Sequence, residues 1–277
     1  MRLSHTILLF LLTTTLAIGQ NKEKIKGSKI VTEKPKEIGD FTALEIEDNL
    51  TVFLEKGTKN EIKIEADDNL HEIISFDIKE KTLRIYTSKE ANSFKKLTVW
   101  IKYTNDLKTV LAKNSTTVNA IEAVMLDDIT FSTFDFAKLY LNVNSKNFTL
   151  KADDKTKIEL NLKAEKAKVE LSKNAQIKAL FTTTDLAFDL YQKSVATIEG
   201  DATNAVIRLD NNTVFTGSRF NIKNADITTE GYSVCNALAE TKLIVDASDS
   251  SKINLLGTPQ IEVRKFLGEA QLIKKLK

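Results

Sequence analysis

The feature that most constrains this chain is a polar turn flanked by apolar residues, which recurs about every nineteen residues from Leu107 onward. The first apolar residue after each turn falls at Val118, Leu139, Ile158, Ile177, Ile198, Phe215, Cys235 and Ile253. The residue before each turn falls at Leu111, Phe131, Leu150, Leu171, Leu190, Leu209, Thr229 and Ala247. Two rows that share one period are typical of a β-solenoid, in which each strand pairs in parallel with its copy one coil later.

Before this repeat, the sequence alternates apolar and polar residues with a period of two. The apolar positions are Leu44, Ile46, Leu50, Val52, Leu54, Ile62, Ile64, Ala66, Leu83, Ile85, Leu97, Val99, Ile101 and Tyr103. Such alternation predicts strands with one face in a core and the other in water. Between them, Asp67 to Ile74 is predicted to form one short helical turn, with Leu70, Ile73 and Ile74 on one face.

The turns themselves support the solenoid. They are rich in Asn, Asp and Ser, whose short side chains tolerate left-handed backbone and bond local amides. Only two prolines occur, which fits because proline would remove donors from the strand ladders. The predicted fold is all-β: a right-handed parallel β-helix-like solenoid with a more open β-strand region at its N-terminal end. An antiparallel sandwich with irregularly spaced turns is the alternative.

The N-terminus predicts export. Arg2 precedes the apolar run Ile7–Leu12, and Ala17 and Gly19 stand at the −3 and −1 positions of a signal-peptidase site. We predict a signal peptide over 1–19 and a flexible leader over 20–37, which is charged and contains Pro35. No stretch is long enough to form a transmembrane segment, so we expect a periplasmic, cell-surface or extracellular protein.

Composition excludes several kinds of site. The chain has 40 basic and 38 acidic side chains, and without a basic cluster it is not expected to bind nucleic acid. His71 is the one histidine after the signal peptide and Cys235 the one cysteine, so no zinc cluster or disulfide framework can form. Nine glycines form no phosphate loop, and no cofactor is predicted. The lone Cys235 is expected to be a small buried residue.

Acidic side chains are the candidates for chemistry. In the predicted register Asp210 and Glu230 occupy matching outward positions on neighbouring coils, with a spacing of about 5 Å that resembles a retaining glycosidase pair. Glu170, Asp189 and Arg208 form a similar row, which is also consistent with a solvated face where Arg208 offsets Asp189. Fold analogy alone supplies no active site. We therefore keep Asp210 and Glu230 as candidates and predict no enzyme activity.

Acidic doublets offer a second kind of chemistry, because carboxylates at turns can ligate calcium. They are Asp67-Asp68, Asp127-Asp128 and Asp153-Asp154. No calcium-loop motif surrounds them. We therefore predict turn and cap residues rather than a metal site.

Several segments of the sequence resemble the GIN domain family, whose members are exported adhesin head domains of unknown function from Bacteroidetes-type bacteria. These segments are Ile38–Leu44, Leu50–Val52, Ile64–Leu70 and Lys81–Ile85. The resemblance covers 38–265 and leaves a C-terminal tail over 266–277. It implies an exported, β-helix-like domain and supplies no catalytic residue. The chain departs from the family in placing Lys and Asn where members commonly carry glycine at coil corners.

The sequence therefore predicts an exported, non-enzymatic binding or adhesion module. A rod with a polar exterior suits extended ligands, meaning glycans or cell-envelope proteins. One alternative is a glycan-active lyase or hydrolase that uses Asp210 and Glu230. The other is a structural protein of the cell envelope with no ligand.

Overall fold

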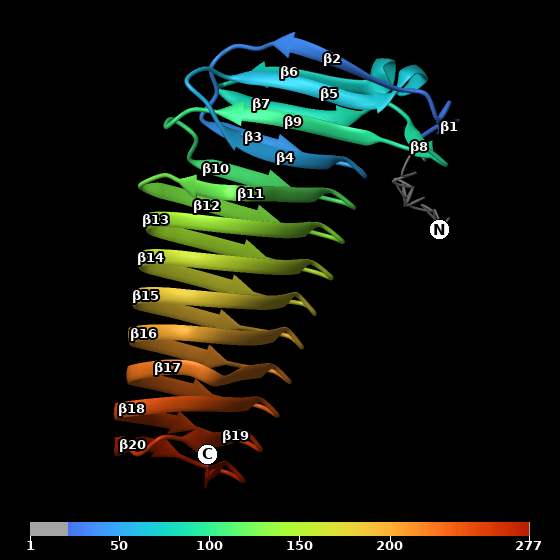
Figure 1. Cartoon of the computed structure of the whole chain (residues 1–277). Coiled ribbons are helices and arrows are strands. Elements are labelled where there is room, and N and C mark those ends of the chain that lie inside the picture. The colour runs from blue at the N-terminus through green and yellow to red at the C-terminus, as the bar shows by residue number, and fades with distance from the viewer. Residues whose placement is uncertain (1–21, 277) are drawn as a thin grey trace, which may run out of the picture.

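The computed structural model describes residues 22–276, so the predicted signal peptide over 1–19 lies outside the described residues. Figure 1 shows a β-solenoid of about nine turns, with a more open group of strands at its N-terminal end. From β10 onward every strand pairing is parallel. This confirms the predicted all-β solenoid and excludes the antiparallel sandwich.

Each regular coil consists of one long strand and one tight turn. Ile158, for example, pairs with Ile177 nineteen residues later. The solenoid strands are β10 (Thr109–Ala112), β11 (Thr117–Met125), β12 (Asp128–Thr133), β13 (Lys138–Ala152), β14 (Lys157–Leu171), β15 (Gln176–Leu190), β16 (Val195–Leu209), β17 (Val214–Thr229), β18 (Val234–Ala247), β19 (Lys252–Leu256), β20 (Gln260–Phe266) and β21 (Gln271–Lys274). Alternate side chains of each strand point inward and form rows along the solenoid axis.

The tight turns stack because each contains a residue with left-handed backbone. In ten successive turns this residue has φ between 48° and 72°: Asp48, Asn114, Asp135, Asp154, Lys173, Gln192, Asn211, Gly231, Asp249 and Gly268. Eight of the ten are Asn, Asp or Gly, the residue types for which this conformation costs least. The predicted role of Asn and Asp at the corners is thus confirmed.

The interior rows are filled mainly by aliphatic side chains and phenylalanine. Phe188 packs edge-on against Phe215, with ring centroids 5.5 Å apart, and Phe181 packs in the same way against Phe220 at 6.3 Å. Beside the turns the interior is polar, because hydroxyl side chains lie fully buried there: Thr116, Thr156, Ser194, Thr213, Ser233 and Ser251. Thr213 donates to the Ser233 hydroxyl over 3.1 Å, which satisfies part of this row.

The predicted rows were wrong at three places. Leu171 pairs with Ala152 and not with Leu150, so Phe131 and Leu150 belong to a neighbouring interior row. Ala196, not Ile198, pairs with Ile177 and Phe215. Both residues point inward, and a shift of two along a strand preserves the face, so the pattern alone could not distinguish them. Leu111 is half-exposed and points outward, and its neighbours Val110 and Ala112 occupy the interior.

The N-terminal strands close one end of the solenoid. They are β1 (Lys24–Lys26), β2 (Val31–Glu37), β3 (Ala43–Ile46), β4 (Thr51–Lys56), β5 (Glu61–Asp67), β6 (Ile74–Lys79), β7 (Thr82–Thr87), β8 (Glu90–Asn92) and β9 (Leu97–Tyr103). The pair β3 and β4 lies between β7 and β9 on one side and β10 and β11 on the other. Antiparallel strands β2, β5 and β6 extend beyond β7 and β9 and cover this end.

The segment predicted to be a flexible leader contains two of these strands. β1 pairs with β8, and β2 runs antiparallel to β5 with Pro35 opposite Lys63. β2 is an edge strand, where proline and exposed charges are tolerated, so its composition resembles that of a disordered segment. At the other end, β21 lies in the predicted tail and pairs with β19.

Asp67 joins the leader to the domain. Its carboxylate is fully buried and accepts hydrogen bonds from the backbone N–H groups of Lys29, Lys95 and Lys96 at 2.8–3.2 Å. Burial alone would raise the pKa of Asp67, but these hydrogen bonds lower it below its usual value. The predicted helical turn follows directly as a 3-10 helix, η1 (Asp68–Ile73), with Leu70 and Ile73 buried.

Candidate functional site

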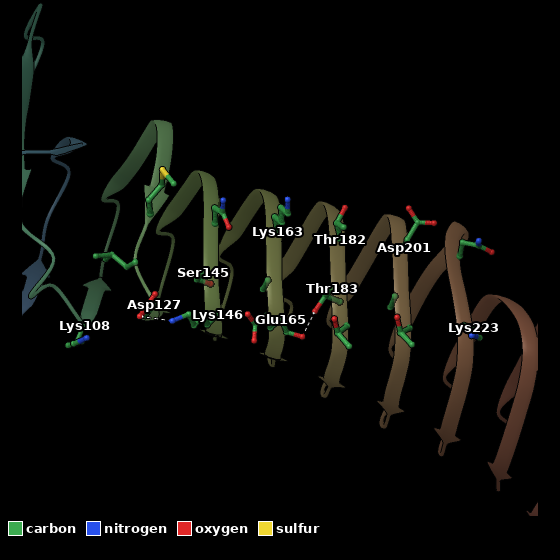
Figure 2. A pocket seen from close by; sticks show the side chains of 18 of the residues that line it. Lys108, Asp127, Ser145, Lys146, Lys163, Glu165, Thr182, Thr183, Asp201 and Lys223 are labelled. Atoms are coloured by element: carbon green, nitrogen blue, oxygen red, sulfur yellow. Dashed lines mark hydrogen bonds and ion pairs between the residues drawn. The ribbon is translucent and has the colours of Figure 1, made fainter.

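Among the described residues, a groove of about 1040 Å³ crosses successive coils. It runs along the rounded corner of the solenoid, where β13 to β17 bend in mid-strand (Figure 2). We call it the corner groove. It lies on the bend of the long strands and not at the stacked tight turns.

The sequence makes this corner by breaking its alternation once in each coil. In β14 the alternation of exposed and buried residues stops at Glu165 and Lys166, which are both exposed. The residues just before the bend form the floor of the groove and are small: Ser145, Ala164, Thr183 and Ala202, each 5–8% exposed. Small floor side chains leave the surface hollow, whereas the side chains that flank them rise on both sides.

One rim of the groove is a row of different polar groups on consecutive coils. Asn144, Lys163, Thr182, Asp201 and Asn221 are matched in the register of β13 to β17. Neighbouring members lie one strand spacing apart, about 4.8 Å, so the row extends over roughly 19 Å. Figure 2 shows Lys163, Thr182 and Asp201 along one edge of the groove. This rim therefore presents amide, ammonium, hydroxyl and carboxylate groups along one line.

The opposite rim is partly held by internal contacts. Lys146 forms an ion pair with Asp127 over 3.0 Å, and this hydrogen bond and charge raise the pKa of Lys146. The Thr183 hydroxyl lies 3.3 Å from the carbonyl oxygen of Glu165, to which it donates. These contacts therefore fix the rim that contains Lys146, whereas the rim that contains Lys163, Thr182 and Asp201 is freer to move.

The charges of the corner groove nearly cancel. Five lysines and four carboxylates line it, which gives a net charge of +1. No aromatic side chain is among its lining residues. The surface thus suits a neutral polar chain better than a polyanion, because polyanion binding relies on clustered basic residues.

Aromatic side chains on the outside of the coils lie away from this groove. Phe53 on β4 and Trp100 on β9 stack with ring centroids 4.3 Å apart, and Lys63 lies 5.2 Å above the Trp100 ring. Trp100 instead lines a smaller pocket together with Pro35 and Lys102.

The candidate catalytic residues Asp210 and Glu230 follow matched positions on β16 and β17. They stand on the tight-turn edge and are not among the residues that line the groove. Glu230 lies 3.7 Å from the ammonium of Lys265. In the neighbouring row, Glu170, Asp189 and Arg208 are matched as predicted, and Arg208 lies 3.8 Å from Asp189.

Other residues singled out in the sequence have structural contacts. Cys235 is fully buried, and burial raises the pKa of its thiol to about 12, as expected for a small core residue. His71 is buried with its Nε2 atom 2.8 Å from the Thr32 hydroxyl. Burial and the nearby charge of Lys34 lower the pKa of His71.

The three acidic doublets also serve the fold. Asp67 caps backbone amides, Asp127 pairs with Lys146, and Asp153 accepts hydrogen bonds from Ser172 and Lys173. Within residues 22–276 no three His, Cys, Asp or Glu side chains gather in a metal-binding arrangement. No helix in that range is long and apolar enough to cross a membrane.

A family model described as "Putative auto-transporter adhesin, head GIN domain" matches residues 40–259, most of the solenoid and its N-terminal cap. The chain belongs to this family. The match confirms the resemblance based on the N-terminal segments.

Solved structures share the fold of this GIN domain protein. A "putative adhesin" from Parabacteroides merdae has a TM-score of 0.64 at 18% identity, with 92% of this chain and 100% of that chain covered. One from Parabacteroides distasonis has 0.65 at 16%, with 91% and 100% covered. A "putative lipid binding protein" from Parabacteroides distasonis has 0.65 at 14%, with 92% and 100% covered. No curated protein matches the chain.

Proposed function

We propose that this GIN domain protein is an exported, non-enzymatic binding module that holds an extended glycan of the cell surface in its corner groove. The observation that carries the proposal is the row Asn144, Lys163, Thr182, Asp201 and Asn221, which places five polar side chains on five consecutive coils. A glycan is also a linear chain whose polar groups recur at a short spacing. Membership of an adhesin family supports a ligand on a cell surface.

The chemistry of the groove supports binding rather than catalysis. Glycoside hydrolysis needs two carboxyl groups facing each other across a bond. Of the four carboxylates that line the groove, Asp127 is paired with Lys146, and Asp201 lies in a row between Thr182 and Asn221. The other two, Glu165 on β14 and Glu240 on β18, lie four coils apart. A lipid tail fits less well, since an acyl chain needs an apolar channel and these rims are polar.

The test is retention of the purified protein on arrays of glycans and on polysaccharide extracted from bacterial envelopes. The test variant replaces Lys163, Thr182 and Asp201 with alanine. All three side chains are exposed, so the fold should be retained. We expect the intact protein to be retained with no change in the glycan, and the variant to lose at least about ten-fold in affinity, because three direct contacts are removed.

A matched control is available on the same three strands. Glu159, Lys178 and Thr197 form an outward row on β14, β15 and β16, away from the groove, with the same kinds of side chain. Replacing them with alanine should leave retention unchanged. Equal losses in both variants would contradict the groove as the site. Cleavage of a retained glycan, abolished by Asp210→Ala and Glu230→Ala, would instead favour the enzyme.

A further inference from the structure

The stacked tight turns change the direction of their hydrogen bonds between Asp154 and Lys173. These turns lie along the edge of the solenoid that is away from the corner groove (Figure 1). The central N–H of one turn, that of Lys155, donates toward the N-terminal end, to the Asp135 carbonyl oxygen over 2.8 Å. In the next turn Asn174 donates the other way, to the Gln192 carbonyl oxygen over 3.0 Å. The turns on either side agree with these two: Ser115 donates to Asp48, Phe136 to Asn114, and Lys193 to Asn211.

The change of direction follows from the backbone of the turns. In the first of the two turns only Asp154 has left-handed backbone, with φ of 60°. In the second, Lys173 and Asn174 both have it, with φ of 48° and 74°. These are the patterns of type II′ and type I′ turns, whose central peptides differ by a flip. The fold therefore contains one place where a type II′ turn is followed by a type I′ turn, at Asp154 and Lys173.

Two carbonyl groups face each other at this place. In a trans peptide the C=O points opposite to the N–H of the next residue. Because the Lys155 N–H points toward the N-terminal end, the Asp154 C=O points toward the next turn. The Asn174 N–H points away from that end, so the Lys173 C=O points back toward Asp154. Neither oxygen accepts a hydrogen bond within residues 22–276, and such facing oxygens are satisfied by a group that donates hydrogen bonds.

A cavity of about 450 Å³ opens over the same turns, within the range of pockets that hold small molecules. Its apolar wall is Phe136, whose side chain is 56% exposed. The ammonium of Lys155 lies 5.6 Å from the centroid of this ring. An exposed phenylalanine gains free energy when apolar surface covers it. The cavity therefore offers an apolar platform beside a pair of hydrogen-bond acceptors.

The charged groups of the cavity disfavour an ion as its ligand. Asp135 accepts a hydrogen bond from a backbone N–H over 3.0 Å, and Asp154 lies 3.6 Å from the ammonium of Lys173. Both carboxylates are thus already engaged, and the lysines Lys155, Lys173 and Lys193 repel a cation. An anion would meet the two facing carbonyl oxygens. A neutral molecule with hydroxyl groups avoids both conflicts.

We propose that this cavity binds a neutral sugar residue, which packs one face of its ring on Phe136 and donates hydroxyl hydrogens to the carbonyl oxygens of Asp154 and Lys173. The amide side chains of Asn174 and Gln192 also line the cavity and supply both donors and acceptors for further hydroxyls. This sugar site is separate from the corner groove and does not depend on it.

The first experiment is saturation-transfer NMR on the purified protein with the methyl glycosides of glucose, galactose, mannose and N-acetylglucosamine. We expect transfer to the ring protons of at least one of them. Phe136→Ala should weaken its binding by about ten-fold. Phe134→Ala is the matched control, since Phe134 is 38% exposed in the same turn but does not line the cavity. No transfer to any of the four, or equal losses in both variants, overturns the proposal.

A turn exchange tests the facing carbonyl groups. Lys173→Asn with Asn174→Gly keeps a type I′ turn, which the Asn-Gly pair favours. Lys173→Gly with Asn174→Thr favours a type II′ turn, which takes glycine at its first central position. Both double variants remove the same two side chains, but only the second turns the carbonyl at position 173 away from Asp154. The second should therefore bind about ten-fold more weakly than the first. Equal binding would contradict the role of the carbonyl pair.

Two further measurements distinguish this site from an ion site and from the corner groove. The bound glycoside should shift the amide signals of Lys155 and Asn174, whereas calcium chloride and sodium sulfate at equal concentration should not. Shifts caused by either salt, with none from the glycosides, would overturn the proposal. The variant with alanine at Lys163, Thr182 and Asp201 should bind the methyl glycoside as the intact protein does. Loss of binding there would place the sugar in the corner groove and refute a separate site.

Discussion

Asp67 gives the sharpest stability prediction, because its one buried side chain bonds three backbone amides from two distant segments. Asp67→Ala removes the acceptor for the amides of Lys29, Lys95 and Lys96, which bond to it at 2.8–3.2 Å. A buried donor without a partner costs about 1–3 kcal/mol. Three such donors give an upper range near 9 kcal/mol, and water entering the site lowers it, so we expect a loss of about 3–5 kcal/mol.

The assay is urea unfolding followed by the fluorescence of Trp100, the single tryptophan, which lies on β9 in the same part of the fold. Asp67→Asn keeps one oxygen acceptor and should lose less than Asp67→Ala. Asp68→Asn is the matched control, since Asp68 is exposed and should change stability by less than about 0.5 kcal/mol. A loss for Asp67→Ala no larger than that of the control would refute the capping role.

Three further predictions concern the cap and the core. His71 has a lowered pKa in the folded state, so the unfolded chain takes up a proton at a higher pH than the folded chain does. The free energy of unfolding should therefore fall as the pH drops through about 6.5. In thermal melts, His71→Gln should flatten that dependence on pH. Gly200 has φ of 102° and its added Cβ would lie 2.0 Å from the Phe181 carbonyl oxygen, so Gly200→Ala should lose at least about 2 kcal/mol in urea unfolding. Phe188→Ala should lose about 3–5 kcal/mol, whereas Leu180→Ala, 50% exposed on the same strand, should lose far less; similar losses would place Phe188 outside the core.

Much of the fold could be predicted because the period of the apolar rows follows directly from stacking. A position such as Leu139, Ile158 or Ile177 must recur once per coil, since each strand pairs in register with its copy. Left-handed turn residues such as Asp135 and Asn211 leave an equally local signal. These features depend on neighbouring residues and on one repeat length, both of which a single sequence displays.

The features that could not be predicted depend on contacts between distant segments. β2 is stabilised by pairing with β5, and nothing in its own charged composition indicates this. The corner groove was not predicted because the bend lies inside a continuous strand. Its signal was present as two consecutive polar residues, such as Glu165 and Lys166, preceded by a small one. The acidic residues at matched positions beside the tight turns favoured Asp210 and Glu230 as candidates instead.

The most direct test of a groove that holds an extended glycan is the dependence of affinity on ligand length. Titration calorimetry would use a series of oligosaccharides of increasing length from a glycan that the protein retains. Because the rim covers four steps of about 4.8 Å, affinity should rise with each added sugar up to about four or five and then level off. Alanine at Lys163, Thr182 and Asp201 should remove that rise. A single sugar that binds as tightly as the longest oligomer would contradict the account.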